Sequence, residues 1–230
     1  MVAIATLSGK RIVVDPGHGG KFTGAVGPGG TQEKAVTLGV CLELVHDLVE
    51  LGADVKLTRD SDSEVIPGAS VREDLKARVD IANNWPADLF ISVHANSADH
   101  QSAQGTETYH SNKASDRSKA LAKLVQQSLI AHVQLTDRGV KSSDFYVIKN
   151  TKMPAILVET AFISNPEEEK KLADPATQKL FAKSIATGVS QYLNIEANLK
   201  PDPPTQPDVS GTDILLAPGD PQEMLLARTR

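Results

Sequence analysis

Short runs of apolar, often β-branched residues alternate along the chain with longer segments of helical periodicity. The short runs suit strands that are buried on both faces, and apolar positions three and four apart suit amphipathic helices. The predicted strands are 12–14, 53–58, 87–93, 106–110, 144–149 and 155–158. The predicted helices are 31–51, 71–83, 115–133, 167–172 and 176–193. This alternation predicts an α/β fold: one domain with a twisted, mostly parallel mixed sheet and helices on both faces.

The same pattern predicts which side chains of these elements are buried. The helix at 31–51 has one apolar face, made of Val36, Val40, Leu44 and Leu48. The helix at 176–193 has another, for which we expect burial of Leu180, Phe181, Ile185, Val189, Tyr192 and Leu193. The short strand at 106–110 alternates in the manner of a sheet edge. The single Cys41 lies in an apolar helical run, where we expect a small buried side chain.

The composition of the chain changes near residue 196. A length of 230 residues suffices for one domain with a substantial core. Residues 200–212 are rich in Pro, Asp and Gly, which is linker composition. We therefore expect a folded domain over 1–195, which holds any catalytic machinery, and a Pro-rich linker or C-terminal tail over 196–230.

Charge and hydropathy exclude several classes of protein. The net charge is −5 and no basic stripe stands out, so nucleic acid is not an expected partner. No apolar run approaches the roughly 18–20 residues that span a bilayer, so we expect no membrane span. One cysteine excludes an internal disulfide framework. We expect a monomer.

Three predicted strands lead into an ionisable side chain. His18 follows 12–14 in a Gly-rich loop, His94 follows 87–93, and Glu159 follows 155–158. Glu33, in the first turn of the next helix, lies close to His18 in sequence. Functional sites of open α/β sheets collect at the carboxyl ends of strands. His18 alone fits a metal ligand, a base or an ordinary loop residue, and His94 and Glu159 also fit residues that cap neighbouring backbone.

Together these side chains indicate metal chemistry. Two imidazoles and a carboxylate, with one position left for water, are the ligand set of a catalytic zinc ion. The remaining carboxylate would then serve as a general base. The chain contains no HExxH motif and no CxxC pair, so spacing alone does not assign the ligands.

The order of several separated motifs resembles the zinc-dependent N-acetylmuramoyl-L-alanine amidases, the amidase-3 type of peptidoglycan hydrolase. The match runs from about residue 10 to 193. Its motifs, with Glu33 opening a helix between the first two, are VVDPGHGG, VKLTRD, LKARVDIANNWPADLFISVHAN and GVKSSDFYVIKNTKMPAILVETAFISNPEE. The resemblance implies that His18, Glu33 and His94 bind Zn²⁺ and that Glu159 is the catalytic carboxylate. The substrate would be peptidoglycan, cut between muramic acid and L-alanine for wall remodelling, cell separation or lysis.

Some residues around these motifs are open to more than one interpretation. Asp15 would orient a ligand histidine or form the turn, whereas we expect Arg59 and Arg78 to form structural ion pairs. Asn96 and Asn165 would contact substrate or cap loops. One departure from the family is Ala161, where a glycine is usual, and its methyl group would narrow the substrate cleft or shift the loop. The short polar segment 96–115 predicts no helical insertion over the site.

Two rival functions remain: another zinc peptidase, such as an exopeptidase, on a similar fold, and a non-catalytic peptidoglycan-binding module. The resemblance implies action on the bacterial cell wall, in the periplasm or outside the cell. Residues 1–8 lack a basic leader and a cleavage signature. We therefore expect either an endolysin held in the host cytoplasm before release or an exported protein whose leader has been removed.

Overall fold

A six-stranded sheet with the order β2-β1-β3-β6-β4-β5 forms the centre of the computed structural model, which describes residues 7–196. Residues 197–230, most of the predicted tail, lie outside the described residues. The strands are β1 (Arg11–Pro16), β2 (Asp54–Leu57), β3 (Leu89–Asn96), β4 (Thr106–His110), β5 (Asp137–Ser142) and β6 (Ala155–Phe162). Every neighbouring pair is parallel except β4 and β6. The predicted mostly parallel mixed sheet is confirmed.

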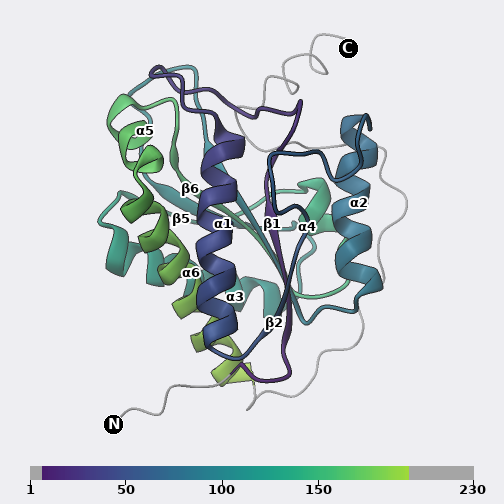
Figure 1. Cartoon of the computed structure of the whole chain (residues 1–230). Coiled ribbons are helices and arrows are strands. Elements are labelled where there is room, and N and C mark those ends of the chain that lie inside the picture. Colours follow the sequence, from purple (N-terminus) through teal and green to yellow (C-terminus); the bar gives the residue numbers. More distant parts are fainter. Residues whose placement is uncertain (1–6, 197–230) are drawn as a thin grey trace.

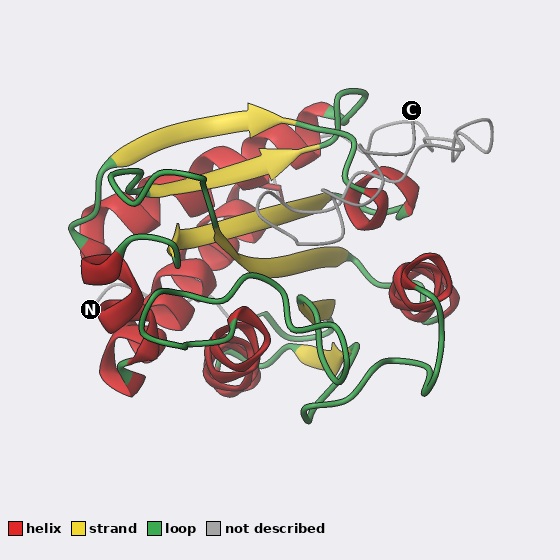
Figure 2. Cartoon of the chain, turned by 90° about the horizontal axis from the view of Figure 1, so that it is seen from above, coloured by secondary structure: helices red, strands yellow, loops and turns green. Residues whose placement is uncertain are grey.

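Helices cover both faces of this sheet, as predicted (Figures 1 and 2). One face packs against α1 (Glu33–Glu50), α3 (Asp116–Val133) and α6 (Pro175–Glu196). The other packs against α2 (Val71–Asn84) and α4 (Tyr146–Asn150), and α5 (Pro166–Ala173) contacts β6 and α6. No helix within residues 7–196 combines the length and apolarity needed to cross a bilayer.

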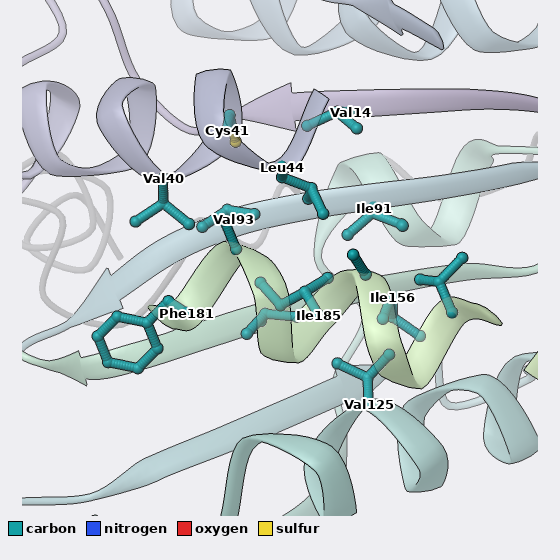
Figure 3. Packing of buried hydrophobic residues seen from close by; sticks show 14 of the residues in the cluster. Val14, Val40, Cys41, Leu44, Ile91, Val93, Val125, Ile156, Phe181 and Ile185 are labelled. Atoms are coloured by element: carbon teal, nitrogen blue, oxygen red, sulfur yellow. The ribbon is translucent and has the colours of Figure 1, made fainter. Parts of the chain in front are cut away.

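The larger core lies between the sheet and α1, α3 and α6 (Figure 3). Val40, Cys41 and Leu44 of α1 point toward the strands, and Cys41 is fully buried as expected. The predicted apolar faces of α1 and α6 are confirmed except at Leu180, which is 37% exposed. Phe181 is buried as expected. Because a step of one residue turns a side chain about 100° around the helix, Leu180 points away from the core that Phe181 faces.

Two strand predictions were wrong. The predicted strand at 144–149 is the short helix α4, and the strand of this region is β5, Asp137–Ser142. Phe145, Val147 and Ile148 are all buried against the second face of the sheet, which a short helix achieves and an alternating strand does not. In addition, β4 is not an edge strand, because it lies between β6 and β5.

The polar residues of β4 explain its edge-like sequence. Thr108 Oγ1 donates a 2.8 Å hydrogen bond to Gln126 Oε1 of α3. Thr106 Oγ1 donates a 3.0 Å hydrogen bond to the carbonyl oxygen of Glu159. Both threonines are fully buried, and their hydroxyl groups are satisfied by these partners rather than by solvent.

A buried ion-pair network joins α2 to the end of β1. Arg78 donates from Nη1 to Asp15 Oδ1 and from Nε to Asp74 Oδ2, both at 2.8 Å. Asp15 also accepts hydrogen bonds from Thr58 Oγ1 at 2.6 Å and from Ser92 Oγ at 2.7 Å. Burial raises the pKa of Asp15, but Arg78 and the two hydroxyl groups outweigh it and leave the pKa below its usual value. Arg78 therefore forms structural ion pairs, as predicted, and its partners are Asp15 and Asp74.

The Arg78→Met variant tests this network. It leaves Asp15 and Asp74 buried without their cation, so we expect the free energy of unfolding to fall by about 3–5 kcal/mol at pH 7. Urea denaturation followed by circular dichroism measures the change.

Lys76→Met on the same helix is the matched control, because Lys76 pairs with Asp80 at the exposed surface. We expect little change in its unfolding free energy. The destabilisation by Arg78→Met should shrink as the pH falls below about 4, since the stability from a carboxylate with a lowered pKa is lost on acidification. Equal stability of the two variants at pH 7 contradicts the network's role.

Candidate metal centre

His18, Glu33 and His94 converge at the carboxyl edge of the sheet from three different elements. His18 lies in the loop after β1, Glu33 is the first residue of α1, and His94 lies inside β3 rather than beyond its end. His18 Nε2 lies 3.1 Å from Glu33 Oε2, and His94 Nδ1 lies 3.0 Å from Glu33 Oε1. The two imidazole rings are 4.8 Å apart between centroids and nearly perpendicular.

The geometry of this group fits a metal ion. One nitrogen or oxygen atom from each of the three residues lies within 4.8 Å of the others. Ligand atoms of a tetrahedral zinc ion, at about 2.0–2.1 Å from the metal, are separated by roughly 3.3 Å, which falls within the 4.8 Å spread of this group. Two imidazole nitrogens and a carboxylate oxygen are also a donor set that zinc prefers.

The protonation states suit metal binding as well. Burial lowers the pKa of His94 despite the opposing effect of Glu33, which favours the neutral imidazole that a metal requires. Burial raises the pKa of Glu33, but His18 and His94 outweigh burial and hold it well below its usual range. Glu33 is therefore an ionised carboxylate in a nearly solvent-free position.

Backbone amides fix the Glu33 carboxylate. Ala25 N donates to Oε2 at 2.9 Å, and Ala95 N donates to Oε1 at 3.0 Å. Each carboxylate oxygen thus faces one histidine and accepts from one amide. Gly24 permits this arrangement, because a Cβ at that position would lie 2.5 Å from Glu33 Oε2.

Two buried arginines hold the loop that carries His18. Arg78 donates to the carbonyl oxygens of Pro16 at 2.7 Å and His18 at 2.6 Å. Arg59 donates to the carbonyl oxygens of Pro16 at 3.0 Å and Gly17 at 2.8 Å. The predicted ion pair of Arg59 is therefore replaced by bonds to backbone carbonyls. These bonds stabilise the left-handed conformation of His18, whose φ is 62°.

Gly17 has a steric reason to be glycine. A Cβ at this position would collide with the imidazole ring of His94. The absence of a side chain at Gly17 lets the loop pass directly over the second histidine.

The first turn of α5 joins two loops and the end of β6 at this edge. Glu169 accepts from Gly29 N at 2.7 Å and Thr31 N at 2.9 Å, in the loop that leads to Glu33. Glu168 accepts from Gly105 N and Phe162 N, which follow β3 and end β6. Sequence reasoning missed both residues, because glutamates in the first turn of a helix are common without any tertiary role.

Of the two roles considered for Asn165, the structure shows the capping role: Asn165 is the N-cap of α5. Its Oδ1 accepts from Glu167 N at 2.9 Å and Glu168 N at 3.2 Å at the start of α5. Its Nδ2 donates to the carbonyl oxygen of Ala103 at 3.1 Å, in the loop after β3. Residues 97–105 form this loop without a helix.

Glu159 lies beside the group, on the neighbouring strand. It is fully buried, and it lies inside β6 rather than after it. In the parallel register of β3 and β6, His94 pairs with Glu159, so the two side chains project from the same face of the sheet. Ala161 lies in the main hydrophobic core with no exposed surface, so the expected narrowing of a cleft by its methyl group was wrong.

Sequence reasoning missed another buried carboxylate on this face. Glu107 of β4 pairs with Glu159 in the antiparallel register of β4 and β6. Asn96 Nδ2 donates to Glu107 Oε1 at 2.7 Å, so Asn96 holds a neighbouring side chain. The only sequence signal for this buried carboxylate was a glutamate in the middle of a short predicted strand.

Comparisons with known proteins agree on one family. A family model described as N-acetylmuramoyl-L-alanine amidase matches residues 12–191. The germination-specific N-acetylmuramoyl-L-alanine amidase of Bacillus subtilis (strain 168) is 39% identical over 205 residues, covering 86% of this chain and 84% of that protein. The amidase LytC of the same organism is 40% identical over 185 residues, covering 80% of this chain but only 36% of LytC.

A solved structure gives the same result. The catalytic domain of CwlV, an N-acetylmuramoyl-L-alanine amidase from Bacillus (Paenibacillus) polymyxa var. colistinus, is similar with a TM-score of 0.73 and 38% identity. The match covers 81% of this chain and 99% of that domain.

Zinc titration of the metal-free protein tests the group. We expect His94→Ala to weaken zinc binding by more than about 100-fold, since even partners of a metal ligand can account for 10–100-fold. His46→Ala is the control, because His46, Asp47 and Glu50 form a second metal-compatible group, on the exposed side of α1. Isothermal titration calorimetry measures both affinities. If His46→Ala loses zinc binding and His94→Ala retains it, the metal binds at His46, Asp47 and Glu50, and the assignment to His18, Glu33 and His94 is wrong.

Proposed function

The chain belongs to the Amidase_3 family of N-acetylmuramoyl-L-alanine amidases, and we propose that it hydrolyses peptidoglycan in a zinc-dependent reaction. The bond cut is the amide between the lactyl group of N-acetylmuramic acid and L-alanine. The observation that supports this function most strongly is the convergence of His18, Glu33 and His94 with Glu159 on the next strand. Action on the bacterial cell wall, in the periplasm or outside the cell, follows from this substrate.

We assign the metal to His18, Glu33 and His94. These residues would hold a zinc ion through two imidazole nitrogens and a carboxylate oxygen. When bound, zinc supplies Lewis-acid chemistry: it lowers the pKa of water to about 7 and polarises a carbonyl oxygen. Hydrogen bonds from two backbone N–H groups hold Glu33, and a hydrogen bond from Arg78 holds the His18 loop, without any metal.

Glu159 carries the proton transfers in this proposal. As the general base, its carboxylate takes a proton from the water that attacks the amide carbon. It then gives this proton to the leaving nitrogen of L-alanine as the C–N bond breaks. The products are a carboxylate on the lactyl group and a free amine on the peptide. Burial beside the metal ligands keeps Glu159 close to the reacting atoms.

The Glu159→Gln variant tests this role. An amide cannot take the proton, so we expect kcat to fall by roughly 10²–10⁴-fold while zinc stays bound. Release of peptides from purified peptidoglycan measures turnover, and elemental analysis measures zinc. Glu50→Gln, at the far end of α1, is the matched control and should keep full activity. Turnover of Glu159→Gln near that of the unaltered protein would rule out the assignment.

The reaction class is tested by product identity. An amidase releases peptides that begin with a free L-alanine amine and leaves an intact lactyl carboxylate on the sugar. Mass spectrometry of a digest, with and without a chelator, identifies both ends. Cuts elsewhere in the peptide would indicate a zinc peptidase instead, and binding without cleavage would indicate a non-catalytic module.

A further inference from the structure

Glu107 is surrounded by four hydrogen-bond donors. Its Oε1 accepts from Asn96 Nδ2 and from the Tyr109 hydroxyl, both at 2.7 Å. Its Oε2 accepts from Arg138 Nε at 2.6 Å and forms an ion pair with Lys141 Nζ. Burial raises the pKa of Glu107, but Lys141 and Arg138 outweigh burial and lower it on balance. The side chain is thus an ionised carboxylate, 2% exposed, that anchors two cations.

The two cations exceed the charge that they neutralise. Arg138 and Lys141 carry two positive charges against the single negative charge of Glu107. Their side chains are 35% and 36% exposed, so they reach from the buried carboxylate to the surface. Taken together, Arg138, Lys141 and Glu107 carry one net positive charge, and the two cationic side chains are partly exposed.

The free nitrogens of this pair are already oriented. The Arg138 guanidinium lies 4.7 Å from the centroid of the Phe162 ring, and its Nη1 donates a long bond to the carbonyl oxygen of Gln104. Its Nη2 has no hydrogen-bond partner among residues 7–196. Lys141 Nζ lies 5.9 Å from the Tyr109 ring. A planar guanidinium fork held on a ring and beside an ammonium group is suited to a second carboxylate.

The position of the pair relates it to the catalytic residues. Along the sheet, β3, β6, β4 and β5 are consecutive neighbours, and they carry His94, Glu159, Glu107 and the two cations in that order. Adjacent strands lie about 4.8 Å apart, so β5 is about 10 Å from the strand of Glu159. An extended peptide advances about 3.3 Å per residue. A span of about 10 Å corresponds to about three extended residues, so a carboxylate within about three residues of the scissile amide can reach the cations.

The chemistry of the substrate decides which end reaches the cations. In N-acetylmuramic acid the only carboxyl group is consumed by the scissile amide, so the sugar side offers no anion there. An anion can come only from the peptide. We propose that Arg138 and Lys141 bind a carboxylate on the residue directly after L-alanine and so make the enzyme selective for acidic stem peptides. This proposal rests on the proposed amidase function.

A pair of soluble substrates tests the selectivity. They are N-acetylmuramoyl-L-alanyl-D-glutamate and its diamide, which differ only in the charge of the second residue. With the zinc-loaded protein we expect kcat/KM to favour the dicarboxylate by about 10–100-fold, mostly through KM, as hydrogen bonds to a charged group typically give. We expect Lys141→Met to lower this ratio to within a few-fold of one, since Arg138 remains to pair with Glu107. Lys119→Met, on the opposite face in α3, should keep the original ratio.

The outcomes separate this proposal from the proposed function. Equal cleavage of both substrates by the unaltered protein would overturn the selectivity and leave the amidase function standing. An unchanged ratio in Lys141→Met and Arg138→Gln, with both variants folded, would mean that the cations only neutralise Glu107. If neither substrate is cleaved, calorimetry of zinc-loaded protein with L-alanyl-D-glutamate and its diamide decides: tighter binding of the dicarboxylate supports the subsite, and equal binding overturns it.

Discussion

The organisation of this molecule depends on the buried ion pairs and hydrogen bonds of the Arg78 guanidinium. It forms ion pairs with Asp15 and Asp74 inside the protein, and it also donates to the carbonyl oxygens of Pro16 and His18. A single side chain therefore joins α2 to the end of β1 and sets the path of the loop that carries His18. Because a buried charge is costly without partners, removing any member of this network affects both folding and the shape of the site.

Carboxylates organise the rest of the carboxyl edge. Glu33 accepts hydrogen bonds from two backbone N–H groups and faces both histidines. Glu168 and Glu169 accept four more, from the loops after β1 and β3 and from the last residue of β6. Charge-assisted hydrogen bonds of this kind are short and directional, so they hold irregular loops nearly as firmly as regular structure does. The loops around the site are thus fixed by neighbouring helices, while Glu33, His94 and Glu159 lie on regular elements, and both features favour pre-organisation.

Much of this could be predicted from the sequence, and the failures have physical reasons. The β-branched run before His18 and the apolar faces of α1 and α6 depend on local periodicity, so the α/β fold was accessible. His18 follows its strand as predicted, whereas His94 and Glu159 lie inside β3 and β6, which extend beyond their apolar runs. The motif resemblance added the expectation that Glu33, and not Glu159, is the carboxylate that binds the metal. In contrast, α4 was mistaken for a strand because Phe145, Val147 and Ile148 are buried by tertiary contacts. Glu107, Glu168 and Glu169 were missed because their partners lie far away in the chain.

We propose that His18, Glu33 and His94, from separate elements, form one zinc centre that Glu159 serves from the adjacent strand. X-ray absorption spectroscopy at the zinc edge of the loaded protein tests the first part directly. The account predicts two imidazole nitrogens at about 2.0–2.1 Å, with the remaining ligands oxygen. The imidazole contribution should fall to one in His94→Ala and stay at two in His46→Ala. A sulfur ligand, a shell of oxygen atoms alone, or an unchanged spectrum in His94→Ala would contradict it.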